Sequence, residues 1–257
     1  MTILETLCVA FGMFSRLPVP HIPWNERNMR YMLCAFPLVG AAAGLLLWGW
    51  IWLCTALSLG RVLFAAGVTL LPVAVTGGIH LDGFCDVCDA LACHAGAEKR
   101  REILKDPHAG AFAVIGAGAY LLLYFGLASE LPATRETALS LGLCYILERA
   151  LSGLGVLCFP SAGKPGLLST FRKTAERKYA AAALFVIWGL AAAGLIFFSW
   201  PAGAAAVLAG LLCFFWLRVM SARSFGGMSG DLSGWFLQVC EISMLAAYIL
   251  TTKAVAL

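Results

Sequence analysis

Residues 31–60 read YMLCAFPLVGAAAGLLLWGWIWLCTALSLG and contain no Lys, Arg, Asp or Glu. Cys34–Leu59 lies within this stretch and is long enough to cross a bilayer as one helix, which takes about 20 apolar residues. The chain of 257 residues is 61% hydrophobic and 12% charged, whereas a soluble domain carries about 25% charged residues. The composition therefore predicts an integral membrane protein in contact with a lipid bilayer. The formal net charge of +4 is too small and too scattered to indicate nucleic-acid binding.

Charged residues divide the rest of the chain into similar apolar stretches. Pro lacks an N–H and fixes φ, so the long uncharged run 179–218 divides at Trp200-Pro201-Ala202-Gly203 into two helices. The predicted spans are Cys34–Leu59, Val62–Ile79, Ala111–Ser129, Thr137–Pro160, the two halves of Tyr179–Arg218, and Leu232–Thr252. We therefore expect an all-α fold, a polytopic membrane helical bundle of about seven transmembrane helices. Thr2–Ser15 is short and carries Glu5, so it is expected to form an interfacial or re-entrant helix.

Lys and Arg gather in alternate loops of this arrangement. Loops 21–33, 80–108, 161–178 and 218–231 hold 2, 4, 5 and 2 of them, whereas the opposite side holds only Arg61, Arg135 and Lys253. Because the cytoplasmic loops of membrane proteins carry an excess of Lys and Arg, we expect these four loops to face the cytoplasm from a bacterial inner membrane. The motifs described below lie in these loops or begin there.

Residues 76–91, Thr-Gly-Gly-Ile-His-Leu-Asp-Gly-Phe-Cys-Asp-Val-Cys-Asp-Ala-Leu, carry three aspartates on one helix face. Asp82, Asp86 and Asp89 stand at i, i+4 and i+7, within an arc of roughly 60° at about 100° per residue. Carboxylates stacked in this way repel one another unless a cation lies between them. Mg²⁺ prefers such oxygen ligands and completes its shell with phosphate oxygens and water. The alternative is a solvated helix start whose acids suit the helix dipole. The acids directly follow an apolar span, where ionisable groups are usually functional, and this favours Mg²⁺.

Residues beside the first aspartate suit the same site. His80 is a candidate general base, metal ligand or donor to a phosphate oxygen, and the alternative is a histidine bonded to backbone at a helix start. Gly78 and Gly83 allow backbone to approach a ligand closely. Small residues in membrane helices also serve plain helix packing, so the glycines alone do not decide between the two roles.

The cysteines raise a zinc alternative. The ten cysteines are spread through apolar stretches and are typical of small core residues rather than of a disulfide framework. Cys85, Cys88, Cys93 and His94 lie close together, but no second ligand cluster follows at the spacing that zinc sites use. Cys85 and Cys88 also project from a different helix face than Asp82, so zinc is the less favoured ion.

The basic residues around position 100 suit a phosphate group. Arg makes bidentate contacts to phosphate and Lys acts as a point charge, so Arg100, Arg101 and Lys105 are candidate ligands of a nucleotide diphosphate. The excess of cations in cytoplasmic loops would place them here in any case. Asp106 precedes Pro107 and is either a further metal ligand or an N-cap for the next span.

Two further groups of polar residues lie towards the C-terminus. In residues 224–235, a Gly-rich turn feeds a helix start, an arrangement that binds phosphate, so Gly230 is a candidate contact and Asp231 is either a cap or a metal ligand. Glu148, Arg149 and Glu241 are charged inside predicted spans. Because neighbours in sequence do not face each other on a helix, we expect Glu148 and Arg149 to find separate partners. These serve either helix assembly or, with Arg149 as a substrate contact, catalysis.

Three motifs and the opening of the chain carry a family resemblance. They are Gly77-Gly78-Ile79-His80-Leu81-Asp82-Gly83 with Asp86 and Asp89, Arg101-Glu102-Ile103-Leu104-Lys105-Asp106 with Gly110, Gly227-Met228-Ser229-Gly230-Asp231 with Gly234 and Glu241, and Arg16-Leu17-Pro18-Val19-Pro20 with Pro37-Leu38-Val39-Gly40. With these residues the sequence resembles the cobalamin synthase family, the adenosylcobinamide-GDP ribazoletransferases. The resemblance covers almost the whole chain, and the first motif is highly specific.

The resemblance implies the last assembly step of vitamin B12. The phosphoryl group joined to adenosylcobinamide in adenosylcobinamide-GDP passes to the ribose 3′-hydroxyl of α-ribazole or α-ribazole 5′-phosphate, GMP leaves, and Mg²⁺ is required. Residues 1–257 would then form a single transmembrane catalytic domain, and the sequence is compatible with a homo-oligomer. In this hypothesis His80 or a carboxylate, Asp82 or Asp86, takes the proton. The proposed Mg²⁺ ligands are Asp82, Asp86, Asp89 and Asp231, with Asp106 as a further candidate.

Two other functions use some of the same residues. A CDP-alcohol phosphotransferase is also a membrane enzyme with stacked aspartates, but it carries an Asp-Gly-x-x-Ala-Arg run, and here Asp82-Gly83 is followed by Phe84-Cys85-Asp86. A transporter would use charged residues inside the spans as an ion path. Transporters commonly show repeated halves, and no repeat is visible in this sequence.

Overall fold

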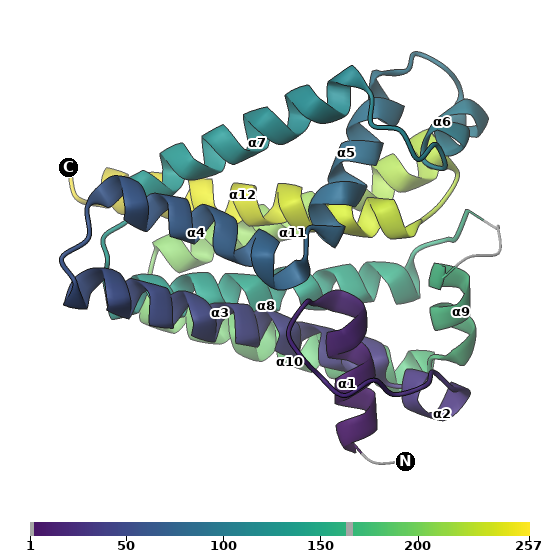
Figure 1. Ribbon diagram of the computed structural model, residues 1–257, viewed down its shortest axis with the longest axis horizontal. Coiled ribbons are helices and arrows are strands. Elements are labelled where there is room, and N and C mark those ends of the chain that lie inside the picture. The colour runs from purple at the N-terminus through teal and green to yellow at the C-terminus, as the bar shows by residue number, and fades with distance from the viewer. Residues whose placement is uncertain (1–2, 163–166) are drawn as a thin grey trace.

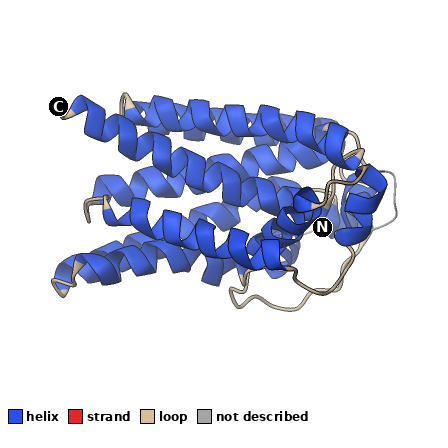
Figure 2. Cartoon of the chain, turned by 90° about the horizontal axis from the view of Figure 1, so that it is seen from above, coloured by secondary structure: helices blue, strands red, loops and turns tan. Residues whose placement is uncertain are grey.

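The spans predicted from the sequence form a helical bundle. The computed structural model describes residues 3–162 and 167–257, and this part of the chain is built of helices, with one isolated β-bridge between Ser161 and Met228 (Figures 1 and 2). Six helices are long and apolar enough to cross a membrane, and a bent pair makes up to seven, which confirms the predicted fold class. The six are α3 (Met32–Ala56), α7 (Ala111–Ser129), α8 (Arg135–Cys158), α10 (Arg177–Phe198), α11 (Ala202–Phe225) and α12 (Gly230–Val255). The break between α10 and α11 falls at Trp200-Pro201, as predicted.

The seventh span differs from the prediction. Val62–Ile79 was expected to be one continuous helix followed by a loop, but α4 (Arg61–Thr76) ends early and α5 (Ile79–Ala92) leaves it at 94°. Gly77 and Gly78 have φ values of 64° and 80°, in the left-handed region that costs glycine no steric penalty. Two successive left-handed residues end one helix and redirect the chain. The three aspartates lie on a helix, as their spacing predicts, and this helix, α5, packs against α7 and α12.

The short helices and the basic segments gather at one end of the bundle. α2 (Glu26–Met29), α6 (Ala97–Ile103) and α9 (Leu167–Thr174) all lie at this end (Figure 1), and α2 contacts α9. The predicted N-terminal helix is α1 (Ile3–Phe14), which packs against α3. Residues 163–166, which include Lys164 of the third basic loop, lie outside the described residues. At the opposite end Lys253 Nζ lies 2.9 Å from Glu130 Oε2.

The close contact between α3 and α8 is possible because glycines stand where the two helices cross. A Cβ on Gly40 would lie 2.4 Å from the carbonyl oxygen of Tyr145, and one on Gly44 would lie 2.7 Å from the Cα of Gly142. Small residues at such crossings let helix backbones approach each other, which is how membrane helices associate without a hydrophobic driving force. These positions therefore set the distance between the two helices.

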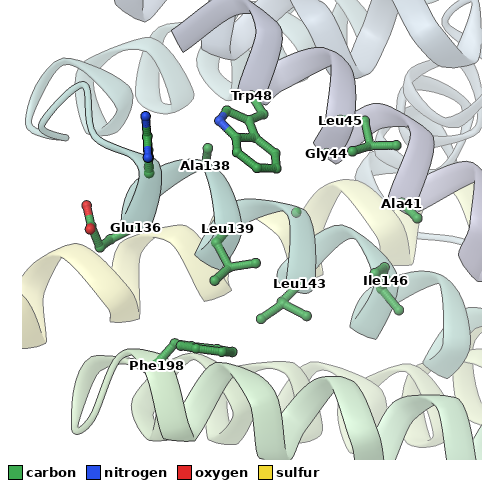
Figure 3. A pocket seen from close by; sticks show the side chains of 12 residues that line it. Ala41, Gly44, Leu45, Trp48, Glu136, Ala138, Leu139, Leu143, Ile146 and Phe198 are labelled. Carbon is green, nitrogen blue, oxygen red and sulfur yellow. The ribbon is translucent and has the colours of Figure 1, made fainter. Parts of the chain in front are cut away.

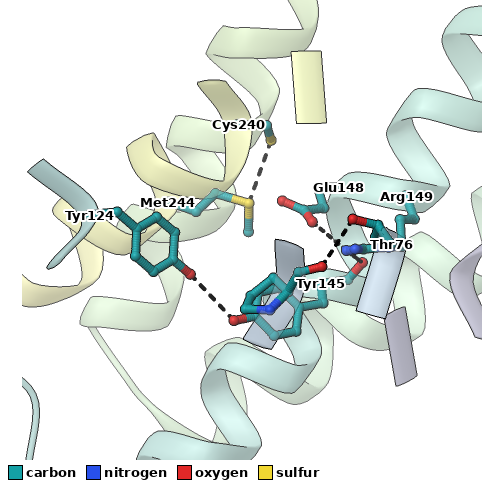
Figure 4. Close-up of polar contacts among 8 residues, drawn as sticks. Thr76, Tyr124, Tyr145, Glu148, Arg149, Cys240 and Met244 are labelled. Carbon is teal, nitrogen blue, oxygen red and sulfur yellow. Dashed lines mark hydrogen bonds and ion pairs between the residues drawn. The ribbon is translucent and has the colours of Figure 1, made fainter. Parts of the chain in front are cut away.

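A buried ion pair lies inside α8 and corrects one prediction. Glu148 and Arg149 were expected to find separate partners, yet Arg149 Nη1 bonds to Glu148 Oε1 and also donates to the carbonyl oxygen of Tyr145 at 3.1 Å (Figure 4). Both side chains are fully buried, at 0% and 1% exposure. The Arg side chain is long enough to curl back beside its own helix, and an isolated charge in this apolar interior would be more costly than the strained reach.

We predict that Gly44→Ala lowers the stability of the bundle by about 1–3 kcal/mol, because the new methyl group overpacks a backbone contact. The matched control is Gly49→Ala on the same helix, where a Cβ meets no atom within 4 Å. The measurement is the midpoint of thermal unfolding in detergent, which should fall for the first variant only. Equal midpoints for the two variants would contradict the assigned α3–α8 contact.

Candidate functional site

Some of the predicted site residues come together where α5 crosses the start of α12. A Cβ on Gly83 would lie 2.9 Å from the carbonyl oxygen of Asp231, and one on Gly234 would lie 3.0 Å from the carbonyl oxygen of His80. The two helix backbones are thus in contact, and neither position tolerates a side chain without movement. This crossing brings residues from the first and third sequence motifs to the same place. It also shows that Gly83 serves helix packing, the second of the two roles considered for it.

A cavity of about 250 Å³, here called the crossing cavity, lies beside this contact. It is lined by His80, Asp82, Asp231 and Gly230, together with apolar side chains from α1, α3, α8 and α9. His80 is 6% exposed, and its Nε2 has no hydrogen-bond partner among the described residues. Buried polar atoms are almost always bonded, so an unpartnered ring nitrogen on a cavity wall indicates a place for a ligand.

A second cavity of about 540 Å³ meets the first at Asp82 and is here called the Arg16 cavity. Its wall includes Ser15, Arg16, Gly77 and Gly78. The backbone N–H of Arg16 donates to the carbonyl oxygen of Val75 at 2.8 Å, and its side chain lies against Gly77, where a Cβ would come within 2.2 Å of Arg16 Cγ. Arg16 belongs to the opening motif of the sequence but was not among the predicted site residues. Arg16 lies in the same cavity as Asp82 because the chain turns between α4 and α5. The sequence around Arg16 does not indicate this turn.

Asp82, Asp86 and Asp231 form the acidic side of the site. Asp86 is half-buried and within electrostatic reach of Asp82, Asp231 and Asp89. Ser229 caps α12 by accepting from the backbone N–H of Leu232 at 3.2 Å, which leaves Asp231 in the first turn. Among residues 3–162 and 167–257, no group of three His, Cys, Asp or Glu is close enough to hold a metal ion. Two carboxylates are enough for Mg²⁺ when phosphate and water complete the shell.

Asp89 has a different role in the structure from the one predicted. It accepts hydrogen bonds from the backbone N–H groups of Gly110 at 2.6 Å and Ala113 at 3.0 Å, one to each carboxylate oxygen. These N–H groups belong to the first turn of α7, whose N-cap residue Gly110 offers no side chain. Asp89 therefore caps α7 from the neighbouring helix α5, and its position as a metal ligand stays a prediction without support in this geometry.

Asp106 neither lines the two cavities nor caps α7. It accepts from the backbone N–H of His108 at 3.0 Å and lies 2.8 Å from the Nδ1 of the same residue. The backbone hydrogen bond is the main reason that the pKa of Asp106 is below its usual value. Sequence reasoning weighed a cap or a ligand for this residue because Asp106 stands shortly before the next span. The cap comes instead from Asp89, a partner that lies far away in sequence.

The predicted phosphate-binding cations lie apart from the two cavities. Arg100 Nε donates to the carbonyl oxygen of Cys93 at 3.4 Å, and Arg101 Nη1 donates to the carbonyl oxygen of Phe225 at 2.8 Å, at the end of α11. Lys105 is exposed just after α6, and Arg149 is buried in its pair with Glu148. None of the four lines the crossing cavity or the Arg16 cavity. These contacts connect Arg100 and Arg101 to the ends of α5 and α11, and phosphate binding by the basic stretch stays a prediction.

A further cavity, about 620 Å³, has the wrong chemistry for a diphosphate. It lies between α3, α8 and α10 and is lined by apolar side chains such as Trp48, Leu139, Leu143 and Phe198 (Figure 3). Arg135 and Glu136 are the charged residues on its wall, and they carry opposite charges. A lining of this kind suits an apolar group rather than a charged substrate, so volume alone does not identify the site.

Comparison with known proteins gives one consistent family. A family model described as cobalamin-5-phosphate synthase matches residues 6–249. An adenosylcobinamide-GDP ribazoletransferase from Lachnoclostridium phytofermentans is 39% identical over 239 residues, which cover 93% of this chain and 91% of that protein. Proteins of the same name from Pseudomonas paraeruginosa (35% identical; 96% and 98% covered) and Desulfitobacterium hafniense (33% identical; 95% and 96% covered) are also similar. No solved structure matches the chain.

We predict that Asp89→Ala lowers the free energy of unfolding by about 1 kcal/mol, because two N–H groups of α7 lose their acceptor. Asp89→Asn keeps one acceptor oxygen and should cost less. The midpoint of thermal unfolding in detergent checks both variants, and Asp106→Ala, in an exposed turn, is the control. If Asp89→Asn leaves stability unchanged but abolishes a response to Mg²⁺, Asp89 is a metal ligand and not a cap.

Proposed function

The chain belongs to the cobalamin-5-phosphate synthase family, and from this premise we propose that the α5–α12 crossing performs a Mg²⁺-dependent adenosylcobinamide-GDP ribazoletransferase reaction in the membrane. The single observation that carries the assignment of the site is that Asp82 and Asp231, from separate motifs, line one cavity with an unpartnered His80. The excess of Lys and Arg at this end of the bundle supports a cytoplasmic site in a bacterial inner membrane.

The reaction replaces the phosphoanhydride bond of a diphosphate with a phosphate ester bond. The ribose 3′-hydroxyl oxygen of α-ribazole, or of its 5′-phosphate, forms a bond to the phosphorus that carries adenosylcobinamide. The bond from this phosphorus to the GMP oxygen breaks, and GMP leaves with the electron pair. The hydroxyl proton passes to a base. Such a transfer needs positioning and neutralisation of charge more than covalent help from the protein.

The acidic side of the site fits Mg²⁺. Asp82 and Asp231 would hold the ion, and Asp86, one turn further along α5, would add negative charge beside it without being a ligand. The three carboxylates are close enough to repel one another, which is the condition under which a divalent cation is favoured. When bound, Mg²⁺ would neutralise charge on the diphosphate and make GMP a better leaving group.

His80 is the base that the geometry favours. Its ring lies in an edge contact with Phe36 at 5.8 Å between centroids, and Nε2 has no protein partner among the described residues. A neutral imidazole with a free nitrogen can accept the hydroxyl proton at the wall of the same cavity that Asp82 and Asp231 line. The carboxylates are then left to the metal.

The alternatives have less support. The sequence after Asp82-Gly83 lacks the Ala-Arg pair of CDP-alcohol phosphotransferases, and the similar proteins carry another name. A transporter would need the charged groups in the spans as an ion path, but Glu148 and Arg149 are paired with each other inside the bundle.

We predict that the purified protein releases GMP from adenosylcobinamide-GDP and α-ribazole only with Mg²⁺. Asp82→Asn and Asp231→Asn should lower this rate by roughly 100-fold, since each removes a ligand that stabilises the charge in the transition state. Asp106→Asn is the matched control, because its carboxylate is bonded to His108 away from both cavities. Full activity in the presence of a chelator, or in the Asp82→Asn variant, would overturn the proposal.

A further inference from the structure

We propose that the two substrates reach Asp82 through different cavities. The donor diphosphate lies in the Arg16 cavity, where Arg16 grips it, and the aromatic base of the acceptor lies in the crossing cavity against Phe14. The inference rests on the proposed function and adds to it a residue, Arg16, that binds the donor and an aromatic wall that selects the acceptor.

The Arg16 cavity has the polarity that a diphosphate requires. Arg16 and Asp82 line the same cavity, yet the described structure contains no ion pair between them. Opposite charges that share a cavity without pairing leave room for a group that satisfies both. A phosphate facing the guanidinium and a cation facing the carboxylate would do so, and Arg suits the bidentate contact.

Local backbone, rather than an ion pair, positions Arg16. Its N–H is tied to Val75 at the end of α4, and its side chain passes over Gly77, the residue where α4 ends. The chain break that sends α5 across α12 thus also aims Arg16 at the cavity. The backbone of Arg16 is thus fixed before an anion binds, which lowers part of the ordering cost of binding.

The crossing cavity has an aromatic wall suited to a planar base. The rings of Phe14 and Phe36 are 4.3 Å apart between centroids, those of Phe14 and Phe171 are 6.3 Å apart, and all three residues line the cavity. Apolar rings stack well on a flat heterocycle, whereas a diphosphate placed among them would lose its hydration without compensation. His80 touches Phe36 on this wall and shares the cavity with Asp82. A ribose hydroxyl placed between a base at Phe14 and a phosphorus at Asp82 would therefore meet its proton acceptor.

The test is a steady-state measurement of KM for each substrate with Arg16→Gln and Phe14→Leu, followed by GMP release. The acceptor is α-ribazole without the 5′-phosphate, so that no phosphate on the acceptor can account for an effect of Arg16. We expect Arg16→Gln to raise the donor KM about tenfold, the loss of one charge-assisted contact, and to leave the acceptor KM unchanged. Phe14→Leu should raise the acceptor KM and leave the donor KM unchanged. Arg27→Gln, an exposed cation of α2 at the same end, is the control.

An increase in the acceptor KM for Arg16→Gln, or equal changes in both constants for both variants, would overturn the assignment of the cavities. Thermal unfolding of each variant checks folding, and Phe14→Met, whose flexible side chain can fill an irregular gap, replaces Phe14→Leu if that variant is unstable. A separate result tests the proposed function. If the wild-type protein shows no Mg²⁺-dependent GMP release, the proposed function is wrong, whatever Arg16→Gln does to either KM.

Discussion

The contact between the backbones of α5 and α12 is the constraint on which the site depends. Gly83 and Gly234 provide it, since a methyl group at either position would meet backbone atoms at about 3 Å. With the helices this close, Asp82 and Asp231 share a cavity although they belong to different motifs. The glycines of these motifs are therefore required for the contact between the helices, as the aspartates are required for the proposed chemistry.

The other local features place α5 for this contact. The left-handed pair Gly77 and Gly78 turns the chain by 94° after α4, and Asp89 at the far end of α5 holds the start of α7. The acidic helix is thus fixed at both ends before any ligand binds. It lies against the spans rather than in open solvent, where water could attack the diphosphate in place of the acceptor hydroxyl.

The sequence predicted well those features that depend on local composition. The span Ala111–Ser129 has the predicted bounds, and Asp82, Asp231 and His80 meet in one cavity as residue types and motifs indicated. The sequence did not predict features that depend on contacts between residues far apart in the chain. The cap that Asp89 gives to α7, and the place of Arg16 beside Asp82, follow from the path of the chain between helices, and no spacing near either residue reports that path. The pairing of Glu148 with Arg149 was missed because helical spacing describes where side chains leave the backbone, not how far a long side chain can bend.

A structure with adenosylcobinamide-GDP and Mn²⁺ bound tests the central claim most directly. The account predicts anomalous density for the ion on the carboxylates of Asp82 and Asp231, with the diphosphate beside it. Well-ordered density for the ion and the diphosphate elsewhere, with these two aspartates bonded only to lysine or backbone groups, would contradict it.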